Sequence, residues 1–159
     1  RTPFVLGAIQ EAKTVGAFTI GLCNNTSTSL TEICDISIVP EVGPEVVMGS
    51  TRMKSGTSQK LVLNMISTSV MIKLGKVYGN LMVDLNPNNE KLMHRATRII
   101  SLATDLAPEE AYNYLMQSGK NPKIAIVMAK TGTTKEQAKV LLENTGGYVY
   151  RALQLFREE

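Results

Sequence analysis

The sequence predicts an α/β protein, with a helix–strand–turn–strand–helix succession in its first half and short helices in its last third. The succession occupies residues 3–74, and alternation of this kind is typical of a parallel sheet covered by helices. From residue 108 onwards, prolines and glycines divide the chain into three short helical segments. A chain of 159 residues is long enough for one domain, or for one core with a small appendage.

The first predicted helix covers residues 3–14. Thr2 is a residue type that commonly caps a helix N-terminus, and Pro3 is one that commonly takes the first helical position. Apolar residues then recur at helical spacing, and Gly16 follows as a C-terminal stop.

Two short apolar segments, residues 17–23 and 36–39, predict neighbouring strands. The first reads AFTIGLC, a composition typical of a strand that is buried on both faces. Asn24 begins a polar loop at its carboxyl end, where open α/β sheets bind ligands. A helical turn near residues 30–33 separates the two strands, and Pro40 ends the second.

An uncharged segment, residues 61–72, predicts a helix that continues to about Lys73 and stops at Gly75. The segment is shorter than the roughly 18 residues that a membrane span needs, so we expect a helix of a protein core and no membrane partner. Because it is apolar around most of its circumference, we expect it to be deeply buried or to lie at a subunit interface.

The segment 76–85 is predicted to be irregular, since Gly79 and Asn80 interrupt it. Asn86 and Pro87 are predicted to start the next helix. One face of that helix is apolar, formed by Leu92, Met93, Ala96, Ile99, Ile100 and Ala103. His94, the single histidine, lies beside its charged face and is interpreted as a surface residue without a catalytic role.

Three short helices are predicted after Pro108, each with a recognisable start and stop. Thr133 to Glu136 has the Thr-x-x-Glu pattern of a capping box and is predicted to open the third. We expect a small shared core from Ile124, Ile126, Val127, Leu141 and Leu142. A final amphipathic segment, residues 149–156, is expected to pack on these helices.

Composition excludes some classes of function. The net charge of +3 is small, and the Lys and Arg residues are dispersed, whereas a nucleic-acid-binding protein usually has a concentrated basic face. Cys23 and Cys34 lack the spacing of a metal site and are interpreted as reduced, buried thiols of a cytoplasmic protein.

The most informative segment is GPEVVMGSTRMKSGTSQKLVLNM, residues 43–65. Hydroxyl groups and cations at a helix entrance suit an anion such as a sugar phosphate, because free backbone N–H groups and the positive end of the helix dipole lie there. Glu45 is not required for phosphate binding, and a proton-transfer role would explain it. Ordinary helix capping is the alternative explanation of the hydroxyl residues.

This segment is very similar to the signature of the N-acetylmuramic acid 6-phosphate etherases and of the related glucokinase regulatory protein, within the sugar isomerase (SIS) fold family. The resemblance continues through KVYGNLMVDL and NEKL, residues 76–92, to the end of the sequence. It implies the C-terminal half of a SIS-type parallel-sheet sandwich, residues 1–104. A small three-helix bundle like a ubiquitin-associated domain, residues 105–159, would follow, with a role in packing or dimer support rather than in ubiquitin binding.

In this family, an Arg-Thr-Pro sequence closes a Ser-Gly-Arg-Thr-Pro loop that binds the sugar phosphate. The chain begins with Arg1-Thr2-Pro3 and lacks the Ser-Gly pair, so we expect it to be the C-terminal part of a longer protein. The resemblance also implies a homodimer in that longer protein.

The activity implied by the resemblance is cleavage of the D-lactyl ether of N-acetylmuramic acid 6-phosphate, which gives N-acetylglucosamine 6-phosphate and D-lactate in cell-wall amino-sugar recycling. The reaction is an elimination followed by addition of water, it depends on proton transfer, and it needs no metal or other cofactor. The principal catalytic glutamates of the family lie in the half that is absent from this sequence.

The resemblance and the residue types together give a set of candidate site residues. Glu45 is expected to be an auxiliary acid or base, or a ligand for sugar hydroxyls, because related isomerases have a base in this Gly-Pro-Glu context. The candidate substrate contacts are Arg1, Thr2, Asn24, Ser50, Thr51, Arg52 and Lys54. For Arg52 and Lys54, the alternative is a salt bridge to a neighbouring carboxylate.

Two other functions remain open on the sequence alone. A sugar-phosphate sensor without catalysis, of which the glucokinase regulatory protein is an example, would share the signature and lack the catalytic glutamates. A nucleic-acid-binding helical module at residues 105–159 is disfavoured, because its lysines are interspersed with glutamates.

Overall fold

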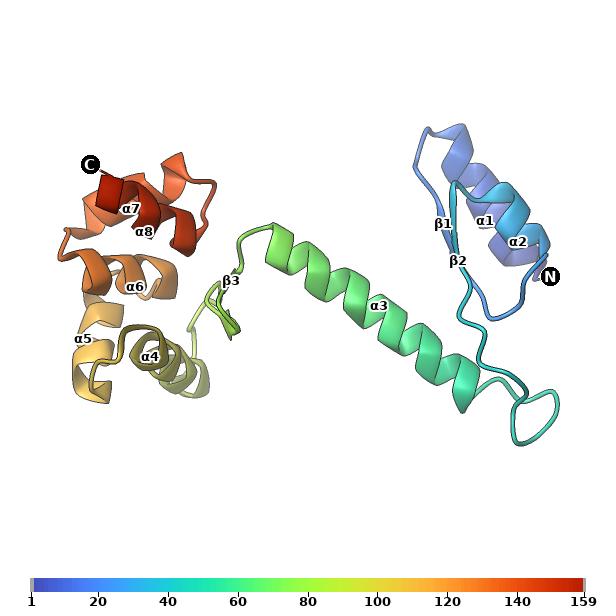
Figure 1. The fold of residues 1–159 in the computed structure, drawn as a ribbon, viewed down its shortest axis with the longest axis horizontal. Helices are drawn as coiled ribbons and strands as arrows, with labels where there is room; N and C mark the ends of the chain where they lie inside the picture. The colour runs from blue at the N-terminus through green and yellow to red at the C-terminus, as the bar shows by residue number, and fades with distance from the viewer. Residues whose placement is uncertain (1, 159) are drawn as a thin grey trace. The chain divides into compact units, whose positions relative to one another are not determined.

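The structure is a computed structural model that describes residues 2–158. Its fold is α/β and mostly helical, with one small parallel and one small antiparallel sheet (Figure 1). It divides into two compact units, an N-terminal unit that extends to Ser67 and a C-terminal unit that begins at Thr68.

The N-terminal unit has the predicted succession of elements. A two-stranded parallel sheet pairs Ile20 with Ile36 and Leu22 with Ile38, and α1 packs beside α2. The elements of this unit are α1 (Pro3–Thr14), β1 (Ile20–Leu22), α2 (Ser29–Ile33), β2 (Ile36–Ile38) and α3 (Lys54–Lys73), whose last turns extend into the C-terminal unit.

The predicted limits of α1 are confirmed. Thr2 occupies the N-cap with extended backbone, Pro3 is the first helical residue, and the backbone reverses just after the helix at Gly16, where φ is +76°. A capping box begins the short helix α2: the side chains of Thr28 and Thr31 each accept a hydrogen bond from the backbone N–H of the other residue.

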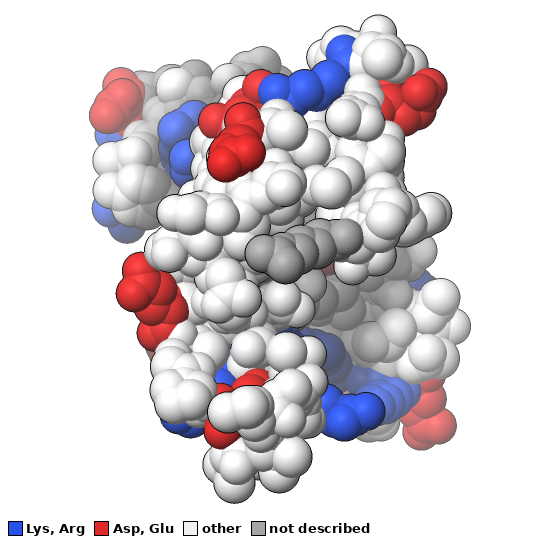
Figure 2. All heavy atoms as spheres, turned by 90° about the vertical axis from the view of Figure 1, so that its right-hand side faces the viewer, with Lys and Arg blue, Asp and Glu red and all other residues white. Residues whose placement is uncertain are grey.

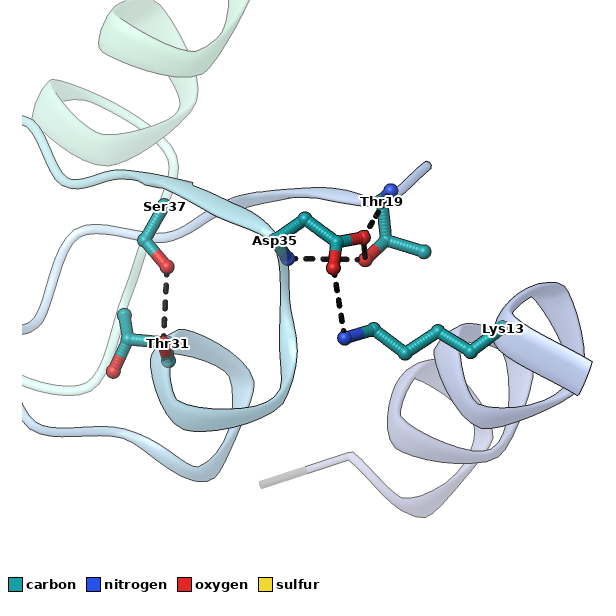
Figure 3. Close-up of polar contacts among 5 residues, drawn as sticks. All are labelled: Lys13, Thr19, Thr31, Asp35 and Ser37. Carbon is teal, nitrogen blue, oxygen red and sulfur yellow. Dashed lines mark hydrogen bonds and ion pairs between the residues drawn. The ribbon is translucent and has the colours of Figure 1, made fainter. Parts of the chain in front are cut away.

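A polar cluster around Asp35 fixes the start of both strands (Figure 3). The Asp35 carboxylate accepts hydrogen bonds from the backbone N–H and the hydroxyl of Thr19, each at 2.7 Å. It also forms an ion pair with the Lys13 ammonium at 3.0 Å. The hydroxyl of Thr19 foremost, then its N–H and the Lys13 ammonium, lower the pKa of Asp35 to about 2. Beside this cluster, Ser37 donates to the carbonyl of Thr31 at 3.2 Å.

Apolar side chains of the N-terminal unit are unusually exposed. The prediction of a strand buried on both faces is wrong for this structure, since Ile20 in β1 is 50% exposed and Ile36 in β2 is 48% exposed. None of the residues of α3 is buried in this structure, so the alternative of a deeply buried helix is not met here, and the alternative of a subunit interface stays a prediction. Two short strands and their helices cannot cover both faces of the sheet. In the view of Figure 2, residues other than Lys, Arg, Asp and Glu form much of the visible surface.

None of the helices within residues 2–158 combines the length and the apolarity that crossing a membrane requires. Cys23 and Cys34 are free thiols, and each is half-buried rather than buried.

The C-terminal unit begins with a hairpin where irregular structure was predicted. Val77 pairs with Met82, and Tyr78 with Leu81, in an antiparallel ladder. Gly79 and Asn80, which were interpreted as interruptions, form the two-residue turn, and φ at Gly79 is +58°. The elements are β3 (Val77–Tyr78), β4 (Leu81–Met82), α4 (Glu90–Thr104), α5 (Pro108–Gln117), α6 (Pro122–Thr131), α7 (Lys135–Asn144) and α8 (Val149–Glu158).

Two predicted helix starts in this unit are displaced. The helix α4 begins after Asn89, whose side chain accepts from the N–H of Leu92, and not at residues 86–87. The capping box of α7 is formed by Thr134 and Gln137, one position beyond the predicted pair, because both side chains there reach the opposite backbone N–H.

The core of the C-terminal unit confirms the predicted apolar faces. The helix α4 packs on α5 and α6, and α8 packs on α6 and α7. The buried side chains include Ala96, Ile99, Ile100, Ala103, Ile124, Ile126, Val127, Leu141, Leu142, Val149 and Leu153. The proposed domain boundary after residue 104 falls between α4 and α5 and stays a prediction.

Tyr148 connects α8 with the end of α3 inside this unit. Its hydroxyl donates to the carbonyl of Lys73. Its ring lies against Gly75, where φ is +67° and an added Cβ would come within 3.0 Å of the ring. The Arg151 guanidinium lies 4.3 Å from the centre of the same ring, on its face.

Candidate functional site

An open cavity of about 620 Å³ lies at the carboxyl ends of β1 and β2 in the N-terminal unit. Its volume falls in the range of roughly 300–1,000 Å³ that is usual for small-ligand sites. The lining is rich in hydroxyl, amide and carboxylate groups, and it includes Thr2, Asn24, Glu45, Ser50, Thr51, Ser55 and Gln59. Five of the predicted site residues are therefore brought together at the expected edge of the sheet.

The N-termini of two helices meet this cavity, and they differ in how their backbone donors are used. At α1, the N-cap residue Thr2 lines the cavity, and within residues 2–158 its side chain makes no capping hydrogen bond. At α3, Glu45 supplies the cap: one carboxylate oxygen accepts from the N–H of Lys54 and the other from the N–H of Ser55, each at 3.1 Å. The positive end of the α1 dipole therefore has no side-chain carboxylate on it within residues 2–158, although Pro3 has no N–H and the N–H of Val5 donates to the Thr2 carbonyl, whereas the start of α3 already holds the Glu45 carboxylate.

The environment of Glu45 keeps its carboxylate charged. Hydrogen bonds from the backbone N–H of Lys54, and then from that of Ser55, lower the pKa of Glu45 below its usual range. Each carboxylate oxygen uses one lone pair in this cap, and the Ser55 side chain also lowers the pKa by hydrogen bonding, so at least one lone pair is left for a hydroxyl donor of a ligand. The carboxylate is therefore a good hydrogen-bond acceptor and a poor proton donor at neutral pH.

The loop between Glu45 and α3 places hydroxyl groups in the cavity. A turn in which the N–H of Ser50 donates to the carbonyl of Val47 at 3.1 Å orients this loop, and Gly49 within it has φ of +85°. Both Ser50 and Thr51 line the cavity.

The predicted cationic contacts lie elsewhere. Arg52 contacts the Ser50 hydroxyl at 3.4 Å, and neither it nor Lys54 is part of the cavity lining. Neither residue forms an ion pair with a carboxylate in the described part of the chain, so the salt-bridge alternative finds no support there. Arg1 lies outside the described residues.

Asn24 lies at the carboxyl end of β1 and is held on several sides. Its side-chain N–H groups donate to the carbonyl of Pro40 at 2.9 Å and to the hydroxyl of Ser58 at 2.7 Å. Its side-chain oxygen accepts from Gln59 at 3.3 Å. With both amide hydrogens used by the protein, Asn24 mainly joins the end of β1 to α3, and its role as a substrate contact stays a prediction.

Two residues of the cavity lining, Ser55 and Gln59, and Ser58, which contacts Asn24, are absent from the set predicted from the sequence. Ser55, Ser58 and Gln59 occupy the first turns of α3 at spacings of three and four, which place them on one face of a helix. That spacing within the Ser-Gly-Thr-Ser-Gln sequence was the signal that could have identified them.

The arrangement suits a ligand that carries an anionic group and several hydroxyls. An open helix N-terminus with neighbouring hydroxyls binds an anion, while an ionised carboxylate and side-chain amides bind hydroxyl and amide groups. A sugar phosphate has both features.

Comparisons with known proteins find similar proteins that are named for an amino-sugar phosphate. The model of the C-terminal lid domain of glucokinase regulatory protein matches residues 79–123. N-acetylmuramic acid 6-phosphate etherases from Clostridium acetobutylicum and Caldanaerobacter subterraneus are each 55% identical to this chain over 155 residues, which is 98% of the chain and 51% of each relative. N-acetylmuramic acid 6-phosphate etherase 2 from Vibrio cholerae is 50% identical over 158 residues, 99% of the chain and 52% of the relative.

The chain thus spans about half the length of the curated relatives it matches. Over 98% of its length, the chain resembles the N-acetylmuramic acid 6-phosphate etherases.

Proposed function

We propose that this chain is the C-terminal part of an N-acetylmuramic acid 6-phosphate etherase, a carbon–oxygen lyase that releases D-lactate and N-acetylglucosamine 6-phosphate. The observation that carries the proposal is the cavity at the ends of β1 and β2, where the open N-terminus of α1 faces hydroxyl groups and an ionised carboxylate. The names and the close similarity of the relatives supply the substrate.

In this proposal, the phosphate of the substrate lies at the N-terminus of α1. Thr2, Ser50 and Thr51 contribute hydroxyl donors, and the N-terminus of α1 contributes the positive end of a helix dipole. The hydroxyls are the main donors, because Pro3 has no backbone N–H and the N–H of Val5 donates to the carbonyl of Thr2. The start of α3 is a poorer place for the phosphate, because the Glu45 carboxylate would repel it there. Arg52 would support the loop through Ser50. For Arg1 and Lys54, a contact with the substrate rests on the family resemblance alone.

The chemistry is an elimination followed by hydration. In the open-chain sugar, the C1 aldehyde acidifies the proton on C2, which a base removes while the C3–O bond to lactate breaks and an acid protonates the departing oxygen. Water then adds at C3 and returns a proton to C2. The principal acid and base would come from the other half of the protein, and no metal or other cofactor takes part in these steps.

In this scheme, the surroundings of Glu45 favour a role as a substrate ligand over a role in proton transfer. A carboxylate whose pKa is lowered by two backbone N–H groups is a weaker base, and at neutral pH it is ionised and has no proton to donate. Its free lone pairs can still accept from sugar hydroxyls, so Glu45 serves as a substrate ligand and as the cap of α3, rather than as an auxiliary acid or base.

The parallel pair β1 and β2, with exposed apolar side chains, fits one half of a SIS-type sandwich that the other half would complete. In the proposed organisation, this domain ends near residue 104, and α5, α6 and α7 form the small bundle like a ubiquitin-associated domain. The complete protein would be a cytoplasmic homodimer, with α3 covered by the missing half or by the partner subunit.

The test is D-lactate release from N-acetylmuramic acid 6-phosphate by a full-length protein that contains this chain. A double variant, Ser50→Ala with Thr51→Val, should raise KM about tenfold or more, because it removes two hydroxyl donors from the phosphate. Thr26→Val, at an exposed loop position outside the cavity lining, is the control.

The match of residues 79–123 to a lid domain of glucokinase regulatory protein keeps a sugar-phosphate sensor as the second candidate. Sugar-phosphate binding by the full-length protein, without any release of lactate, would favour the sensor and refute the etherase.

A further inference from the structure

A directional chain of hydrogen bonds runs along one side of the cavity, from Gln59 through Asn24 and Ser58 to the backbone of α3. The carbonyl of Pro40 can only accept, so the Asn24 group that lies 2.9 Å from it must be the side-chain NH₂. The same NH₂ donates to the Ser58 hydroxyl, which in turn donates to the carbonyl of Ser55 at 2.8 Å. The orientation of the Asn24 amide is therefore fixed.

This orientation determines that of Gln59. Since the NH₂ group of Asn24 is used on the side of Pro40 and Ser58, its oxygen is the atom that Gln59 meets, and an amide oxygen can only accept. Gln59 must present its own NH₂ group, whose nitrogen lies 3.3 Å from that oxygen. Rotating the Gln59 amide by 180° would bring two oxygens together, so the observed orientation is strongly preferred.

The remaining polar atom of Gln59 is its side-chain oxygen, Oε1. Gln59 is half-buried and lines the same cavity as Thr2 and Glu45, and Oε1 accepts no hydrogen bond from any protein group among residues 2–158. A half-buried amide whose nitrogen is held and whose oxygen is free is a hydrogen-bond acceptor of defined direction.

We propose that Gln59 recognises a hydrogen-bond donor of the bound sugar phosphate, a hydroxyl or amide N–H, through Oε1, and that Asn24 is a positioning residue that orients it. The assignment rests on the proposed binding of a sugar phosphate in this cavity. Gln59 thus adds a neutral acceptor to the hydroxyls that hold the phosphate and to the Glu45 carboxylate. An acceptor held in one direction favours sugars with a donor at that position over analogues that lack it.

The experiment compares the full-length wild-type protein with Gln59→Leu, which removes both polar atoms at similar size. Binding of N-acetylglucosamine 6-phosphate is measured by calorimetry, and KM and kcat are measured from lactate release. We expect the dissociation constant and KM to rise about tenfold, as is typical for a lost hydrogen bond to a ligand, while kcat changes much less. Gln154→Leu, the same substitution at an exposed position of α8, should leave both unchanged.

A second ligand identifies the donor. 2-Deoxyglucose 6-phosphate lacks a donor at C2, so a loss seen with N-acetylglucosamine 6-phosphate alone places the Gln59 contact at the C2 amide. An equal loss with both ligands places it at another hydroxyl. Unchanged binding of both ligands to folded Gln59→Leu protein overturns the proposal, and Gln59→Met serves as the second variant should Gln59→Leu not fold.

A double-mutant comparison tests the role of Asn24. Asn24→Leu removes both the NH₂ group that donates to Pro40 and Ser58 and the oxygen that accepts from Gln59, so Gln59 loses its fixed partner and binding weakens. If Asn24 acts through Gln59, Asn24→Leu combined with Gln59→Leu binds no more weakly than Gln59→Leu alone, whereas additive losses would refute the positioning role. Calorimetry also separates the Gln59 contact from the proposed etherase activity. If the wild-type protein binds the sugar phosphate without releasing lactate, the etherase activity is refuted. The comparison of wild type with Gln59→Leu still decides whether Gln59 contacts the ligand.

Discussion

Glu45 closes the N-terminus of α3 through Ser55: one oxygen of its carboxylate accepts from the N–H of Ser55 at 3.1 Å, and the other accepts from the N–H of Lys54 at the same distance. The carboxylate is nine residues before the helix in sequence, so the turn at residues 47–50 has to fold back for the contact to form. Glu45 therefore couples the shape of the cavity loop to the start of α3.

The first prediction concerns Glu45→Gln in the full-length protein. If Glu45 is a ligand and a cap, KM rises while kcat stays within about threefold, and the midpoint of unfolding falls because the helix loses a charged cap. If Glu45 is instead a general acid or base, kcat falls by about 10²–10⁴. Steady-state kinetics and a thermal melt distinguish the two roles, and Glu41→Gln, at an exposed position of the same loop, is the control.

The second prediction concerns pH and Asp35. Its pKa of about 2 in the folded protein lies below its ordinary value of 3.8, so its ionisation stabilises the folded state. That stabilisation is fully present above pH 4 and is lost as the pH falls from about 4 to about 2. As the pH falls from about 4 to about 2, we expect the urea concentration at the midpoint of unfolding to fall in the wild type and to fall much less in Asp35→Asn. Glu11→Gln, at an exposed position of α1, is the control and should retain the wild-type pH dependence. Identical pH profiles for the wild type and Asp35→Asn would contradict the role of this cluster.

The third prediction separates backbone conformation from packing at Gly75. An alanine at φ of +67° costs about 1–2 kcal/mol of stability through its backbone alone, and its Cβ would also lie 3.0 Å from the ring of Tyr148. Gly79→Ala is a matched control, since φ is +58° there and nothing lies within 4 Å of an added Cβ. Urea unfolding should show a larger loss for Gly75→Ala than for Gly79→Ala; equal losses would mean that Tyr148 moves aside freely.

The fourth prediction is a homodimer in the complete protein. The helix α3 has large apolar side chains around its circumference, among them Leu61, Leu63, Met65, Val70 and Ile72, and all of these are exposed in this structure. Soluble proteins rarely leave such a surface uncovered. Sedimentation velocity across micromolar concentrations should give the mass of two subunits. A monomer throughout this range would indicate that the other half of the protein alone covers α3.

The order of the elements could be predicted from the sequence because local signals mark their ends. Thr2 with Pro3, and Gly16 beyond the helix, define α1 without help from tertiary structure. The same holds for Pro108 and Pro122, each of which is the first residue of its helix. Thr133 and Thr134 are both suitable N-cap residues, and the sequence does not distinguish them. The backbone conformation makes Thr134 the N-cap, so the predicted start of α7 is wrong by one position.

The candidate site was predictable in its members but not in its hydrogen bonds. The likeness of residues 43–65 to a known signature identified Glu45, Ser50 and Thr51, which do line one cavity. That Glu45 caps α3, and that Gln59 meets Asn24 from a position 35 residues away, depends on how the loop folds back onto the helix. Exposure was likewise unpredictable, since β1 and α3 have core-like compositions although little in this structure covers them.

The last prediction is that residues 1–159 alone release no lactate from N-acetylmuramic acid 6-phosphate, whereas the full-length protein does. In the proposed function, the principal acid and base lie in the other half, and losing such a group costs about 10²–10⁴ in rate. The fragment also exposes the apolar side chains of Ile20 in β1 and Ile36 in β2, so it is expected to associate in solution. The assay compares the fragment, the full-length protein and full-length Glu45→Gln at equal concentrations. Turnover by the fragment would place the chemistry within residues 1–159 and make Glu45 the principal base.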